Sequence, residues 1–187
     1  SRGLVGSEMC IRDRLDDMLC VLYIKVNRQK MAHTAYLSII GKTQGSISQG
    51  CNTKDSIGNK AQESHSNEIT VLACNFSLSK HGGPAEVVIT KPIDKASPLL
   101  GNAFSKQEHM QCTIKFYRTN EQGYNENFYT IELVDALITT LSFDQPNVLN
   151  SGDEDMSETL HLSYRDITWK HNMAGTEGYE TWERFLG

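Results

Sequence analysis

The sequence contains no apolar run long enough to cross a membrane as a helix. The only membrane-like segment, Met18–Ile24, spans seven residues and is followed by Lys25, whereas a spanning helix needs about 20 apolar residues. Asp16 and Asp17 precede the segment and basic residues follow it, which reverses the charge order of a signal peptide. We therefore expect no signal peptide and no membrane insertion.

Cysteine and positive charge are also too sparse for two common classes of protein. Cys10, Cys20, Cys51, Cys74 and Cys112 are scattered and form no CxxC pair, which fits neither a disulfide framework nor a zinc site. The net charge of −5 argues against nucleic acid as a partner, because phosphate contacts need a clustered basic face. We expect free thiols in a reducing cytosol and no bound metal.

Catalytic motifs are missing as well. Gly41-Lys42-Thr43 matches the end of a phosphate-binding loop, but Tyr36 stands where that loop needs its first glycine. Ser48 and Ser56 lie outside any GxSxG turn. The six histidines have no spacing that places two of them on one helical face as metal ligands. We therefore expect no enzyme activity and no cofactor.

The first thirty residues differ in character from the rest. Met9–Asp13 reads like the translation of an adapter used to prepare DNA sequencing libraries. Residues 1–14 would then be adapter read-through, residues 15–30 translated upstream DNA, and Met31 the natural start. We expect residues 1–30 to be a non-native or artefactual extension and residues 31–187 to form a single domain. A genuine N-terminal extension is the alternative.

From Met31 onward, apolar residues recur with a period of two, which predicts strands with one buried face. The clearest example is 110–118, where every second residue from Met110 is apolar. In 67–79 the apolar phase shifts after Val71, and in 157–170 it shifts after Tyr164. One extra residue moves every later side chain to the opposite face, so we expect a β-bulge at both points.

Two further segments complete the fold prediction. The stretch 126–143 keeps its apolar residues on one phase except at Asp135, so it is either one long bent strand or two strands. A short helix is expected from Ser97, as N-cap, through Pro98 at the first helical position to about Gln107. Bulged, bent strands suit a closed or nearly closed barrel. The sequence therefore predicts a mainly β fold with one helix.

Four stretches of this domain, taken in order, carry a family resemblance. They read AYLSIIGKTQG at 35–45, IDKASPLL at 93–100, IKFYRT at 114–119 and LSYRDITWKH at 162–171. They resemble the opening strand and turn, the approach to the helix, the following strand and a late strand of the Hcp (haemolysin-coregulated protein) family. Trp182, with the Ala-Gly-Thr before it, resembles the tail of that family.

The resemblance implies the function of a secretion tube. Hcp proteins are two-sheet β-barrels with one flanking α-helix, related to phage tail-tube proteins, and six subunits form a ring. Rings stack into the inner tube of the type VI secretion system, are expelled by a contractile sheath and carry effectors in the lumen. The implied partners are copies of the chain itself, the sheath and spike proteins, and small effectors. The implied location is the bacterial cytoplasm, followed by secretion through the apparatus.

The candidate site residues concern assembly alone. Lys80-His81-Gly82-Gly83 is a candidate ring-stacking loop, although the stretch 79–86 is shorter than the equivalent family loop often is. Gly41-Lys42-Thr43-Gln44-Gly45 is a candidate turn at a subunit edge, and Tyr164 and Trp169 are candidate anchors of the core or of the seam between subunits. Solvated loops are the alternative for both loops. A ring-shaped effector-binding chaperone or adaptor that does not stack into a firing tube is the alternative function.

Overall fold

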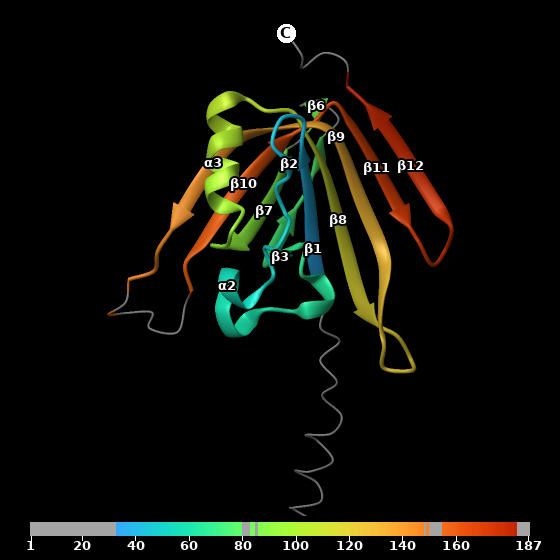
Figure 1. The fold of residues 1–187 in the computed structure, drawn as a ribbon. Helices are drawn as coiled ribbons and strands as arrows, with labels where there is room; N and C mark the ends of the chain where they lie inside the picture. Colours follow the sequence, from blue (N-terminus) through green and yellow to red (C-terminus); the bar gives the residue numbers. More distant parts are fainter. Residues whose placement is uncertain (1–32, 80–82, 85, 148, 150–154, 183–187) are drawn as a thin grey trace, which may run out of the picture. The chain divides into compact units, whose positions relative to one another are not determined.

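The computed structural model describes residues 33–182 except 80–82, 85, 148 and 150–154. The expected extension, residues 1–30, lies outside the described residues. From His33 the chain forms one structural unit, which is mainly β, as the sequence predicts (Figure 1).

The strands are β1 (Thr34–Gly41), β2 (Gly45–Ser46), β3 (Ile69–Val71), β4 (Ala73–Asn75), β5 (Leu78–Ser79), β6 (Gly83–Pro84), β7 (Val87–Pro92), β8 (Met110–Thr119), β9 (Asn125–Asp144), β10 (Ser157–Ser163), β11 (Asp166–His171) and β12 (Thr176–Thr181). The helices are α2 (Lys54–Ile57) and α3 (Ser97–Lys106), and the 3-10 turns are η1 (Gly58–Lys60) and η2 (Glu63–His65).

The long strand β9 joins the two halves of the sheet. Its first half lies between β8 and β11, and its second half, from Leu137, pairs with β10. Asp135 stands between the halves with a φ of 52°, a left-handed conformation that costs a non-glycine residue about 1 kcal/mol or more. The strand β9 bends sharply at one end of the unit (Figure 1). Of the two alternatives for 126–143, the structure shows one long bent strand.

All strand pairs are antiparallel, and the main order is β2-β1-β8-β9-β10-β7-β4. This order does not return to its start, so backbone pairing does not complete the expected closed barrel. However, β3 pairs with β1 and the next strand, β4, pairs with β7, at the other end of the order. Leu72 alone separates β3 from β4, and its N–H donates to Thr90 O of β7 at 2.8 Å. The phase shift after Val71 is therefore a change of pairing partner and not a bulge.

The second predicted shift marks a corner between two strands. Tyr164 and Arg165 separate β10 from β11, which pair with different halves of β9. A true β-bulge lies slightly earlier, where the register against β9 changes between His161 and Leu162. The phase shift after Tyr164 is therefore a corner between two strands and not a bulge within one strand.

The helix α3 lies along one flank of the strands (Figure 1). Its N-cap is Ala96, so Ser97 is the first helical residue and not the cap that we expected. The Ser97 hydroxyl accepts from the Asp94 N–H at 3.1 Å and donates to Glu158 Oε1 at 2.8 Å. The Ser97 hydroxyl therefore bonds to Asp94 and Glu158 and does not cap the helix.

One apolar core contains side chains from both halves of the sheet and from α3. On β8, Met110, Cys112 and Ile114 are buried and Gln111 is exposed, which confirms the predicted alternation. Full burial of an apolar side chain of this size stabilises the fold by about 1.5–3 kcal/mol.

Candidate assembly surfaces

The candidate turn 41–45 is a hairpin between β1 and β2 that a carboxylate holds in place. Glu108, two residues beyond α3, accepts from the N–H groups of Thr43 at 2.6 Å and Gln44 at 2.8 Å through Oε1. Its Oε2 accepts from Gln44 Nε2 at 2.8 Å. These bonds, led by the one from the Gln44 N–H, hold the pKa of Glu108 below its usual range. The turn is therefore fixed by contacts within the chain, while Lys42 and Thr43 remain exposed.

Gly41 is required by this arrangement. A Cβ at position 41 would lie 2.5 Å from Glu108 Oε1, closer than atoms pack. Because the Glu108 carboxylate is held by three donors, it is not free to move away. The turn therefore depends on a glycine at its start and a carboxylate beneath it.

A small cavity of about 200 Å³ opens beside the turn, at the end of the unit where β9 bends. Asp135 in its wall pairs with Arg165 Nη1 and lies 3.8 Å from His109 Nδ1. Arg165 also donates to Asp166 Oδ2 from Nε at 3.0 Å and from Nη2 at 2.8 Å. These bonds raise the pKa of Arg165 and lower that of Asp166. The cavity wall consists of Ile40, Gly41, Lys42, His109, Met110, Gln111, Val134 and Asp135.

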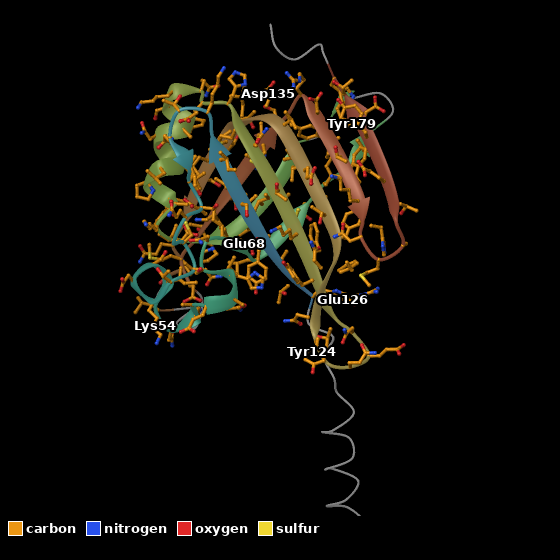
Figure 2. The ribbon with its side chains drawn as sticks, turned by 45° about the vertical axis from the view of Figure 1, so that its right-hand side comes forward. Lys54, Glu68, Tyr124, Glu126, Asp135 and Tyr179 are labelled. Carbon is orange, nitrogen blue, oxygen red and sulfur yellow. The ribbon has the colours of Figure 1, made fainter. Side chains whose placement is uncertain are left out.

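The strands β8 and β9 are joined by a hairpin at the end of the unit opposite to the cavity. Asn120 Oδ1 accepts from the N–H groups of Gln122 at 3.1 Å and Tyr124 at 2.9 Å, and the Asn120 N–H donates to Tyr124 O at 2.8 Å. Tyr124 is 73% exposed. Figure 2 shows Tyr124 and Asp135 at opposite ends of the unit. The hairpin is thus a well-ordered projection with an aromatic side chain in solvent.

The candidate stacking loop lies largely outside the described residues, which omit Lys80, His81 and Gly82. Gly83 belongs to β6 and pairs with Ser79 of β5. The two strands have two residues each, so this connection is a short hairpin.

The two candidate aromatic anchors occupy different environments. Tyr164 is buried, its ring meets Trp182 edge-on at 5.7 Å, and burial raises its pKa to about 12. Trp169 is half-buried and lies opposite Gly178 on β12, where its ring covers the glycine. Tyr164 therefore lies in the core of the subunit, whereas Trp169 borders the exposed strand β12.

Sequence reasoning missed a buried charge cluster. The Lys91 side chain is fully buried, and its Nζ donates to Asp94 Oδ1 at 2.9 Å, Glu158 Oε1 at 2.5 Å and Pro92 O at 2.9 Å. Burial raises the pKa of Asp94, although Lys91 opposes that rise. A signal was available, because Lys91 continues the apolar phase of Val87 and Ile89. The cluster joins β7, β10 and the start of α3.

A second missed cluster holds the segment between β2 and β3 against the sheet. The His65 ring stacks on Tyr36 at 3.7 Å, and its Nδ1 lies 2.6 Å from Glu68 Oε2. Lys115 donates to Glu68 Oε1 at 2.8 Å. Burial opposes ionisation of Glu68, but the bonds from Lys115 and His65 outweigh it and lower the pKa. No local sequence pattern connects Tyr36 and Lys115 to the pair of His65 and Glu68, because these three parts lie far apart in the chain.

Within the described ranges, no group of three or more His, Cys, Asp or Glu side chains is arranged to hold a metal ion. No helix in that part of the chain is long and apolar enough to cross a membrane.

Comparisons with known proteins identify the family of this chain. The family model described as "Type VI secretion system effector, Hcp" matches residues 23–171. The major exported protein of Pseudomonas aeruginosa is 38% identical over 166 residues, covering 81% of this chain and 96% of that protein. The secreted protein Hcp3 of Pseudomonas aeruginosa is 38% identical with a TM-score of 0.75, covering 81% of this chain and 99% of that structure. A further solved Hcp protein is 33% identical with a TM-score of 0.76, covering 80% and 99%. This chain therefore belongs to the Hcp family of type VI secretion proteins.

Proposed function

We propose that the chain is a structural subunit of the type VI inner tube, in which rings of six subunits stack, are expelled and carry small effectors in the lumen. Membership of the Hcp family carries this proposal. Its implied partners are further copies of the chain, the sheath and spike proteins, and the effectors. The name of the major exported protein supports secretion through the apparatus, after assembly in the bacterial cytoplasm. A tube subunit needs no catalytic site.

The proposal includes a closed two-sheet barrel. The consecutive strands β3 and β4 lie on opposite ends of the strand order, on β1 and β7. Leu72, the residue between β3 and β4, donates its N–H to Thr90 O of β7. The chain itself therefore bridges the gap that backbone pairing leaves in the sheet.

Two unlike strand edges support ring formation. The strand β12 pairs with β11 alone among the described residues, and all six of its residues are exposed. Within the same ranges, the second half of β9 pairs with β10 alone. A closed ring of identical subunits needs two different surfaces on each subunit. We propose that these edges, with Tyr179 exposed on β12, form the ring seam.

The test is the solution mass of the full chain, measured by light scattering behind a sizing column. We expect a mass of six subunits. A monomer at high micromolar concentration would contradict ring assembly.

The short β5–β6 hairpin favours the effector-binding adaptor as the second candidate function. Electron microscopy of concentrated rings distinguishes the adaptor from the tube subunit, because adaptor rings remain unstacked.

We also propose that residues 1–30 are not part of the native protein. The intact mass of the protein purified from its source tests this directly. A mass that includes these residues would contradict the proposal.

A further inference from the structure

The β8–β9 pair runs between the two ends of the unit. Strand β8 begins at Met110 in the wall of the cavity and ends at Thr119 beside the hairpin, and β9 returns from the hairpin to Asp135. Ten residues of extended chain cover about 33 Å. Asp135 in the cavity wall and Tyr124 on the hairpin lie at opposite ends of the unit (Figure 2), so the cavity and the hairpin are two different surfaces.

The hairpin has the properties of an inserting element. Its backbone is fixed by Asn120, and Gly123 supplies the left-handed residue with a φ of 85°. A fixed hairpin loses little conformational entropy on binding. The Tyr124 side chain is 73% exposed, and Glu121 adds an exposed negative charge beside it.

The cavity has matching properties. Ile40, Met110 and Val134 contribute apolar groups to its wall, while Lys42 and His109 contribute side-chain nitrogen atoms. Ile40 is 53% exposed, so a β-branched apolar side chain at the mouth is left in solvent. A wall that contains both apolar and polar groups suits a tyrosine, whose ring is apolar and whose hydroxyl needs a hydrogen-bond partner.

We propose that the β8–β9 hairpin of one subunit seats in the cavity beside the 41–45 turn of a second copy in the next ring. This rests on the proposed function. Tyr124 fills the cavity, and Glu121 faces Lys42 of the copy that receives it. Because the contact joins opposite ends of the same strand pair, it is heterologous and repeats without closing. It therefore extends a stack and supplies a ring-to-ring contact beyond the short β5–β6 hairpin.

Charge reversal tests the pairing in the full chain. We expect E121K and K42E each to leave the ring mass unchanged and to shorten stacked tubes at least tenfold, as seen by electron microscopy. The double variant should recover most of the tube length, because the opposite charges meet again. K54E, which reverses an exposed charge on α2, is the matched control and should not change tube length.

A cysteine pair gives an independent readout. Oxidised rings that carry both Tyr124→Cys and Gln111→Cys should give covalent ladders longer than six subunits, whereas neither single variant should. Ladders of six or fewer, or full-length tubes from E121K, would overturn this contact while leaving the ring intact. Unaltered rings that never stack would overturn it as well. A chain that forms no ring at all contradicts the proposed function instead.

Discussion

At the scale of single residues, Glu108 determines whether the β1–β2 turn keeps its shape. Glu108→Gln places an amide nitrogen opposite the Gln44 amide donor and removes the charge that two backbone N–H groups share. Hydrogen bonds to a charged group are worth about 1.5–3 kcal/mol. We expect the free energy of unfolding to fall by about 1–3 kcal/mol in urea titrations at pH 7.

The difference in unfolding free energy between the unaltered chain and Glu108→Gln should also depend on pH. The pKa of Glu108 is lowered in the folded chain, so its ionised form contributes stability that is complete above the ordinary glutamate range. That contribution is lost as the pH falls through the ordinary range toward the folded pKa. The stability difference between the unaltered chain and E108Q should therefore shrink on acidification. A constant difference from pH 7 to pH 3 would contradict this assignment.

Lys91 is a second residue with a large expected effect. Lys91→Met leaves Asp94 and Glu158 buried without their cation, and breaking a buried pair in this way costs about 3–5 kcal/mol. Lys170→Met removes a lysine from an exposed pair with Glu132, where solvent screens the charges, so it should change little. Chemical unfolding of both variants measures the contrast. Equal losses of unfolding free energy in the two variants would contradict the argument that burial makes the Lys91 cluster important for stability.

At the scale of elements, the bend of β9 depends on the backbone of Asp135. Valine is strongly disfavoured at a φ of 52°, whereas asparagine tolerates it. We expect Asp135→Val to destabilise the chain by about 2 kcal/mol or more in urea unfolding, and Asp135→Asn by much less. Thr140→Val, at an exposed position in the second half of β9, is the control and should be close to neutral.

The elements also show how far sequence patterns reach. β8 was predictable because one face of it meets the core, so apolar and polar residues alternate. The helix was predictable, but its first residue was misassigned, because the Ser97 hydroxyl bonds to residues of β10 and the preceding loop. β12 gave no pattern, since both of its faces are exposed. The pairing of β3 and β4 with different strands is a long-range choice that local periodicity does not encode.

The candidate site was predicted in part for the same reason. The 41–45 turn was recognisable from its resemblance to the opening strand and turn of Hcp proteins, yet its anchor, Glu108, is more than sixty residues away in sequence. The relation of the β8–β9 hairpin to the cavity exists only in three dimensions. Contacts between distant segments are where sequence reasoning stopped.

At the scale of the whole molecule, ring closure and ring stacking should depend on different tyrosines. Tyr179 on β12 is 61% exposed and Tyr124 on the hairpin is 73% exposed. Replacing either tyrosine side chain should therefore leave the fold of the chain intact. Tyr179→Ser removes apolar area from the proposed seam and should lower the mass measured by light scattering from six subunits towards one. Tyr124→Ser should preserve the ring and shorten the tubes. Because both changes replace an exposed tyrosine by serine, each is the control for the other. If both variants lost the ring, the separation of seam and stacking surface would be wrong.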